Sequence, residues 1–143
     1  MLGSIFCAAF HSGIGFNDGG KFKVIYTFSY LFFLHWLADF VCQTRWMAEN
    51  KGENPLVLTF HVAVYSLVLF CGMAVLDVFD IGPLLGFVAL NAFLHWITDL
   101  LTSQATKYFY KKQDMHKFFC SIGFDQYVHS VCLMSTTMLF LVK

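Results

Sequence analysis

Charged side chains are scarce in this 143-residue chain, where Asp, Glu, Lys and Arg together make up 13%. Soluble domains carry about 25%, so the composition excludes an ordinary water-soluble domain. The nine basic and nine acidic residues cancel, which leaves no net positive field and predicts no nucleic-acid partner. Disorder is also excluded, because disordered chains are poor in aromatic residues and rich in charge.

The five cysteines show no CxxC or other ligand spacing, and four of them lie inside apolar runs. Cysteine in such runs behaves as a small hydrophobic residue, so neither a disulfide framework nor a thiolate metal site is expected. A secretory leader is lacking too, because residues 1–10 are apolar without a basic start and a glycine-rich stretch follows them. We expect residues 1–22 to form an interfacial arm.

Hydrophobic residues are abundant at 58%, and 19% of the chain is aromatic. A bilayer core needs about 20 helical residues to be crossed, and four apolar segments are long enough: 24–44, 55–76, 81–101 and 118–142. Spanning strands are not expected, because the period-two alternation of a closed barrel is absent. The sequence predicts an all-α fold, an integral membrane four-helix bundle in residues 23–143.

Basic residues are distributed unequally between the two expected faces. The first and third loops contain six of them: Arg45, Lys51, Lys107, Lys111, Lys112 and Lys117. The opposite face has three: Lys21, Lys23 and Lys143. Because basic loops stay in the cytoplasm, we expect a multi-pass protein of the cell inner membrane with its first and third loops cytoplasmic. Membrane lipid is then its expected surrounding partner.

Ionisable residues are costly within a membrane and mark functional sites by default. Seven of them lie in or beside the four segments: His35, Asp39, His61, His95, Asp99, Asp125 and His129. Three segments hold a His and an Asp four positions apart, which places the two side chains on one helical face. A bundle can therefore turn them all inward.

The order of these residues predicts that they share one depth. In the two descending segments the His precedes the Asp, and in the ascending fourth segment the Asp precedes the His. The reversed order and the reversed direction cancel, so each Asp is expected nearer the cytoplasm and each His one turn deeper. His61, early in the second segment, should join the same half of the membrane. We therefore interpret the seven residues as one site.

A short internal repeat supports a shared centre. The run FLHWLAD at 33–39 returns as FLHWITD at 93–99, and each copy begins a helical hairpin whose return segment carries a further His. The two hairpins have the same orientation, as in parallel membrane repeats. One site between two similar halves would hold two metals or one central metal.

Imidazole and carboxylate groups are ligands of Zn, Mn and Fe. We expect a divalent metal, with zinc preferred, held by the seven residues, either as a two-metal centre or as one metal whose ligands are oriented by an Asp. A metal with an open position supplies hydroxide at neutral pH. Asp39, Asp99 and Asp125 are the candidates for a catalytic base.

Four further polar residues are candidates for substrate binding. Gln43 and Gln126 are expected to bind water or substrate, and Arg45 and Lys51 to hold an anionic head group just outside the site. The expected substrate is an amphiphile that reaches the site near the boundary between lipid and cytoplasm.

The residues of the site also carry a family resemblance. The run HWLADFVCQ at 35–43 and the run FDQYVH at 124–129, taken with Lys51, His61 and the pair at 95 and 99, resemble a family of small multi-spanning bacterial and phage membrane proteins of unknown function. Its HxxxDFxxQ and DQxxH elements are fairly specific together. The pattern is more distantly similar to inner-membrane metal-dependent hydrolases, which implies a reaction class by analogy.

The leading hypothesis is metal-dependent hydrolysis of a lipid or lipid-linked ester, including a phosphoester, at the cytoplasmic side. A proton- or metal-coupled transporter is an alternative, and so small a carrier would need to form a homodimer. Another is a non-catalytic membrane subunit of a larger assembly, in which the polar residues join helices. A di-iron oxidoreductase is weaker, because the Glu-x-x-His pairs of such bundles are missing.

Overall fold

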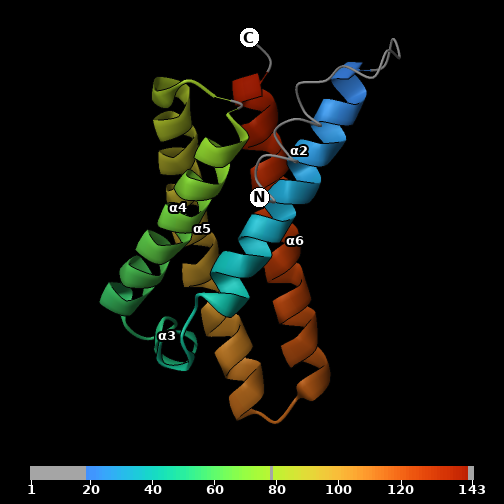
Figure 1. Cartoon of the computed structure of the whole chain (residues 1–143). Coiled ribbons are helices and arrows are strands. Elements are labelled where there is room, and N and C mark those ends of the chain that lie inside the picture. Colours follow the sequence, from blue (N-terminus) through green and yellow to red (C-terminus); the bar gives the residue numbers. More distant parts are fainter. Residues whose placement is uncertain (1–18, 78, 142–143) are drawn as a thin grey trace.

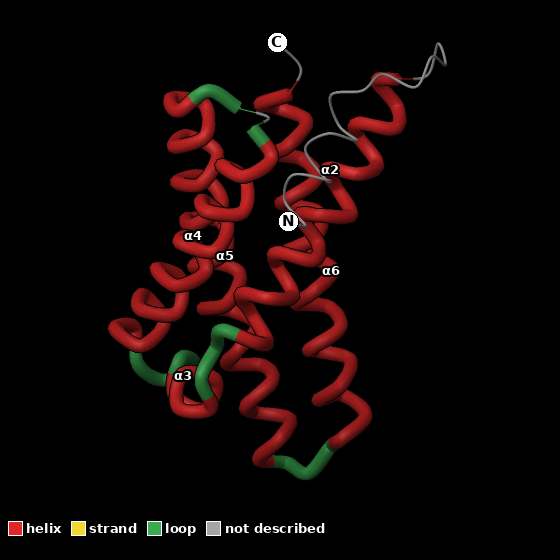
Figure 2. Tube along the Cα trace, in the orientation of Figure 1, coloured by secondary structure: helices red, strands yellow, loops and turns green. Residues whose placement is uncertain are grey.

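The computed structural model describes residues 19–77 and 79–141, and this part of the chain is helical with no strand (Figures 1 and 2). Its elements in order are α2 (Gly19–Trp36), the π-helix η1 (Leu37–Val41), α3 (Arg45–Asn50), α4 (Pro55–Leu76), α5 (Ile81–Lys111) and α6 (Met115–Leu141). The long helices lie alongside one another, and short α3 lies near one end (Figure 1). The predicted all-α fold is confirmed.

The expected arm lies mostly outside the described residues. Its last residues, 19–22, form the first turn of α2. Two helices, α4 and α5, are long and apolar enough to cross a membrane, and Ile25–Val41 is apolar but shorter. Helix α6 does not reach that hydropathy, since it carries Asp125, Gln126 and His129 along its length. Four crossings remain a prediction.

Helices α3 and α4 each begin at a residue whose side chain caps the N-terminus of the helix. Asn54 caps α4 by accepting a hydrogen bond from the Leu56 N–H at 2.9 Å, and Pro55 occupies the first helical position. Thr44 caps α3 in the same way, accepting from the Met47 N–H at 3.3 Å. These caps place α3 across the end of the bundle, between α2 and α4.

The third loop, between α5 and α6, is much shorter than the gap between the expected segments, which end at 101 and begin again at 118. The prediction of a basic loop at 107–117 is wrong, because α5 runs to Lys111 and α6 begins at Met115. The 31 residues of α5 measure about 46 Å and exceed a hydrocarbon core of about 30 Å. The extra turns pair with α6 through Thr106 and Ser121, whose hydroxyls lie 2.9 Å apart. Helix α5 is therefore longer than one bilayer crossing requires.

The apolar core fills the half of the bundle away from α3. Its buried members are Leu31, Leu34, Ala38, Tyr65, Leu69, Met73, Leu84, Phe87 and Leu133. Gly72 lets α2 approach α4 closely here, because a Cβ at this position would overlap the side chain of Leu34. Polar groups also join helices in this half, where the Asn91 amide donates to the Thr136 hydroxyl at 3.0 Å.

Replacement of Gly72 by alanine is expected to destabilise the fold by about 1–3 kcal/mol, because the added methyl group overpacks the contact with Leu34. The matched control is Gly123→Ala, where an added Cβ meets nothing within 4 Å. The control should stabilise by about 0.5–1 kcal/mol through helix propensity alone. Unfolding in detergent measures both, and equal effects at the two positions would contradict the close approach.

Candidate metal centre

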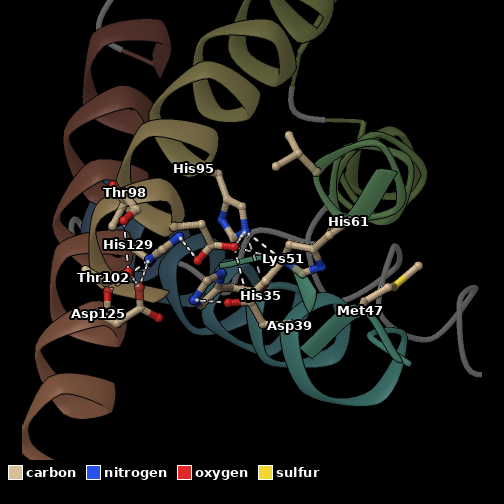
Figure 3. Close-up of polar contacts among 12 residues, drawn as sticks. His35, Asp39, Met47, Lys51, His61, His95, Thr98, Thr102, Asp125 and His129 are labelled. Atoms are coloured by element: carbon tan, nitrogen blue, oxygen red, sulfur yellow. Dashed lines mark hydrogen bonds and ion pairs between the residues drawn. The ribbon is translucent and has the colours of Figure 1, made fainter. Parts of the chain in front are cut away.

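The seven predicted histidines and aspartates lie together in the middle of the bundle (Figure 3). They come from four separate parts of the chain: His35 and Asp39 from the end of α2 and η1, His61 from α4, His95 and Asp99 from α5, and Asp125 and His129 from α6. All but Asp125 are at most 4% exposed. The predicted convergence is therefore observed, although the roles of the individual residues remain predictions.

The two copies of the repeat reach this centre with different backbones. Beyond His35 the chain forms a π-helical turn, in which the Cys42 N–H donates to the Leu37 carbonyl at 2.8 Å. The second copy continues as regular α-helix. The distances from His Nε2 to Asp Oδ2 are nonetheless similar, 3.6 Å in the first pair and 3.5 Å in the second. Single π-helical turns occur frequently at functional sites.

Four side-chain atoms from three elements form a compact donor set. His61 Nε2 lies 3.1 Å from His95 Nε2. His61 Nε2 is also 3.2 Å from both Asp39 Oδ1 and Asp99 Oδ2. His95 Nε2 lies 3.2 Å from Asp39 Oδ1 and 3.5 Å from Asp99 Oδ2. We call these four atoms the primary donor set.

Five of the six distances within the primary donor set match those of a metal site. Nitrogen and oxygen ligands of zinc lie about 2.0–2.1 Å from the metal, which puts neighbouring ligands of a tetrahedron about 3.3–3.4 Å apart. The five distances above run from 3.1 to 3.5 Å. Asp39 Oδ1 has no hydrogen-bond donor among the described residues. The arrangement can therefore bind a small divalent cation.

Lys51 belongs to this centre, which corrects the prediction that placed it just outside. Its Nζ lies 2.7 Å from Asp99 Oδ2 and 3.4 Å from His61 Nε2, and its side chain is only 12% exposed. Helix α3 turns the chain back across the bundle end, so the residue that follows it points inward. Lys51 thus neutralises one carboxylate of the centre.

Asp125 and His129 form the α6 side of the centre. The His129 Nδ1–H donates to the Asp125 backbone carbonyl at 2.9 Å. Asp125 Oδ1 accepts from the Thr102 hydroxyl, and its Oδ2 accepts from the Gln126 amide at 3.0 Å. One ligand atom from each of Asp99, Asp125 and His129 lies within 4.8 Å of the others.

Gln126 joins the two sides of the centre. Its carbonyl oxygen accepts from His35 Nε2 at 3.1 Å, while its amide nitrogen donates to Asp39 Oδ2 at 3.4 Å and to Asp125. The residue therefore orients the buried polar groups. Its predicted role in binding substrate is compatible with its position on the wall of a cavity.

A cavity of about 560 Å³ opens beside the centre. Asp39, Asp125, Gln126 and Lys51 form its inner end. Hydroxyl groups of α5 and apolar side chains form much of the remaining wall, from Phe40, Thr102, Ser103, Thr106, Tyr110, Phe118 and Ile122. Asp39 and Asp125 line this opening, whereas Asp99 and the four histidines do not. This agrees with the predicted depth for Asp39 and Asp125, while Asp99 contacts Lys51, His61 and His95 instead.

Gln43 and Arg45 have different positions relative to the cavity. Gln43 lines it, and its side-chain oxygen is buried without a hydrogen-bond partner in the described part of the chain. Arg45 is 91% exposed and binds Glu49 at 2.7 Å. Arg45 begins α3 and pairs with Glu49, so the structure does not bring it to the centre, and its role in holding an anionic head group stays a prediction.

A second ion pair lies beside the cavity. Lys107 lies on the cavity wall and binds Glu53 at 2.7 Å. The hydrogen bond and charge of Lys107 lower the pKa of the Glu53 carboxyl below its ordinary value. The pair ties the loop after α3 to α5.

Two further residues of the centre were not predicted. Tyr65 stacks on His95 with ring centroids 3.9 Å apart, and Thr102 binds Asp125. The sequence spacing could have indicated both residues, because Tyr65 lies four positions after His61 and Thr102 lies three positions after Asp99. Residues at these spacings share a helical face.

The family model described as "protein of unknown function (DUF3307)" matches residues 27–143. The chain belongs to this family. The matched range contains every residue of the centre of this DUF3307 protein and every wall of its cavity. No curated protein and no solved structure matches it.

Proposed function

We propose that this DUF3307 protein is a membrane-embedded, metal-dependent hydrolase of a lipid or lipid-linked ester. The primary donor set is the observation that supports this most strongly. Each of two buried imidazole nitrogens lies 3.1–3.5 Å from the other and from two carboxylate oxygens. These atoms form a ligand set suited to zinc and compatible with Mn or Fe.

The charges of the centre favour a divalent cation. Asp39, Asp99 and Asp125 contribute three negative charges, and Lys51 contributes one positive charge. With neutral imidazoles, two negative charges remain in a buried site. An uncompensated buried charge is strongly unfavourable, and one divalent cation removes both charges.

The outer surface of the helices supports a membrane location. Large apolar side chains are exposed on several helices, among them Phe33, Phe60, Leu67, Val75, Leu85, Phe93 and Leu139. Soluble proteins rarely expose apolar surface so widely. We propose four crossings of the inner membrane, with α3 and the turn between α5 and α6 in the cytoplasm, where the basic loops belong.

The cavity indicates an amphiphilic substrate. Carboxylates, an amide and Lys51 form its inner end, whereas Phe40, Phe118 and Ile122 contribute apolar wall. An ester or phosphoester group at the inner end would leave an acyl or isoprenoid chain against the apolar wall. Pockets of this size accept a ligand of this kind.

The reaction needs one water and one carboxylate that carries a proton. A metal held by the primary donor set would activate that water, whose oxygen would form the bond to the ester carbon or phosphorus as the bond to the leaving alcohol oxygen breaks. A carboxylate on the cavity wall, Asp39 or Asp125, takes the water proton and returns it to the leaving alkoxide. The products are an acid and an alcohol, so no oxidant or further reactant is required.

Removal of metal tests this function. Protein purified in detergent should contain zinc, manganese or iron by elemental analysis and should hydrolyse ester or phosphodiester lipids in mixed micelles. Dialysis against a chelator should abolish turnover, and addition of the metal should restore it. Turnover that survives complete metal removal would refute the proposal.

The transporter alternative predicts a different result in the same preparation. Reconstituted liposomes would then show proton or metal flux that Asp39→Asn abolishes, without any lipid product. Product formation without flux supports the hydrolase. If neither occurs and replacements in the centre change stability alone, the polar groups only join helices.

A further inference from the structure

We propose a second divalent cation site between Asp99, Asp125 and His129, with Asp99 bridging it to the primary donor set. This inference rests on the proposed function, because it assumes that the primary donor set binds a metal. Asp99 directs Oδ2 toward His61 and His95 and Oδ1 toward His129. A carboxylate that uses both oxygens in this way is suited to bridge two cations about 3.5–4 Å apart.

The hydrogen bond made by His129 Nδ1 leaves Nε2 free to bind a metal. Its Nδ1–H donates to the Asp125 backbone carbonyl at 2.9 Å. The neutral ring therefore carries its proton on Nδ1 and a free lone pair on Nε2. Histidines that bind metals are oriented by this kind of bond from the other ring nitrogen.

Two lone pairs face each other with no donor between them. His129 Nε2 and Asp99 Oδ1 are buried, and neither has a hydrogen-bond partner among the described residues. They lie 3.8 Å apart, which is too far for a direct hydrogen bond. A cation about 2.0–2.2 Å from each atom bridges that gap.

Asp125 completes this site and connects it to the cavity. One ligand atom from each of Asp99, Asp125 and His129 lies within 4.8 Å of the others, and Asp125 Oδ1 is 3.6 Å from the His129 ring at Nδ1. The Thr102 hydroxyl and the Gln126 amide hold the carboxylate in place. Unlike the two histidines of the primary donor set, Asp125 lines the cavity. Three protein ligands with the remaining position toward substrate are typical of catalytic metals.

The second cation narrows the substrate class. Two divalent cations and one bound hydroxide change the charge of the centre from two negative to one positive. A phosphodiester supplies one negative charge, whereas a carboxylic ester supplies none. The two cations therefore favour a lipid phosphodiester. With Asp125 coordinated and Asp39 bound through Oδ1 alone, Asp39 Oδ2 is the carboxylate oxygen left on the cavity wall to accept the water proton.

Metal stoichiometry tests this inference without any activity assay. The purified protein is dialysed against buffered Zn²⁺ alone and analysed for bound metal. We expect about two equivalents per chain in the wild type and about one in Asp125→Asn and His129→Gln, because the primary donor set remains. Asp77→Asn is the matched control, since Asp77 is exposed in a loop and should leave two equivalents bound.

If Asp125→Asn or His129→Gln does not fold, a milder variant and a spectroscopic measurement still test the second site. Thr102→Val keeps all ligands but removes the donor to Asp125, and it should weaken the second equivalent about 10–100-fold. Wild-type protein loaded with Mn²⁺ alone should give the electron paramagnetic resonance spectrum of a coupled pair. Saturation at one equivalent, or two equivalents that Asp125→Asn and His129→Gln both leave unchanged, would overturn the inference.

Different experimental outcomes refute the second cation site and the proposed hydrolase function. Hydrolysis by protein that binds one metal would refute the second site and leave the hydrolase intact. Two bound metals without hydrolysis of any ester or phosphodiester would support the second site and refute the proposed function.

Discussion

Replacement of Asp99 by asparagine is expected to lower the free energy of unfolding by about 3–5 kcal/mol. The Lys51 ammonium is 12% exposed and lies 2.7 Å from Asp99 Oδ2. Removal of the carboxylate charge leaves this ammonium in a buried site without its partner. Unfolding of purified protein in detergent, followed by circular dichroism during titration with a denaturing detergent, measures the loss.

The double variant separates the ion pair from the rest of the centre. Lys51→Met in the Asp99→Asn background removes the unpaired charge and should recover most of the lost stability, as apolar replacements of buried ion pairs do. Metal binding should not return, because Asp99 supplies ligand oxygens. A double variant less stable than Asp99→Asn alone would contradict this account of Lys51.

Replacement of His95 by glutamine is expected to remove the metal and with it the activity. His95 Nε2 lies within 3.5 Å of His61 Nε2, Asp39 Oδ1 and Asp99 Oδ2, so it contacts every other member of the primary donor set. Loss of a ligand should lower turnover by more than the ~10–100-fold that follows from changes to the groups around ligands. Metal content and turnover are measured on the same preparation.

His116→Gln is the matched control for this variant. His116 is exposed near the start of α6, and its replacement should leave metal content and turnover unchanged. Circular dichroism distinguishes a folded protein without metal from an unfolded one. A folded His95→Gln protein with wild-type metal content would show that the primary donor set does not bind the metal.

Two kinds of buried polar contact are present in the bundle. Asn91 and Thr136 satisfy each other across α5 and α6, with bonds of 3.0 and 3.1 Å in the two directions. This is how polar residues join membrane helices. The His and Asp centre differs, because Asp39 Oδ1, Asp99 Oδ1 and His129 Nε2 remain without hydrogen-bond donors in the described residues. Buried groups of that kind call for a bound ion or water.

The helical class and the membership of the centre followed from local patterns. Apolar runs interrupted by Asn54-Pro55 and by Asp77 placed both ends of α4, since these residues cap or stop helices through their own backbone and side-chain chemistry. The spacing of His and Asp by four positions put each pair on one face. Burial of polar groups inside a bundle then brought the pairs together.

The roles of the cationic residues depended on tertiary structure. Arg45 and Lys51 are both basic and near the first loop, yet α3 turns one outward to Glu49 and the other inward to Asp99. The length of α5 was decided in the same way, because its polar last turns are stabilised by contacts with α6 and with Glu53. Local propensity is too weak to specify such contacts.

Residue types and their spacing along single helices already specify a helical chain, rich in apolar surface, with one set of imidazoles and carboxylates. The folded arrangement adds which atoms of that set face one another, which carboxylates reach the cavity and where Lys51 lies. Those outcomes depend on distances between segments far apart in the chain, and packing of the helices sets such distances.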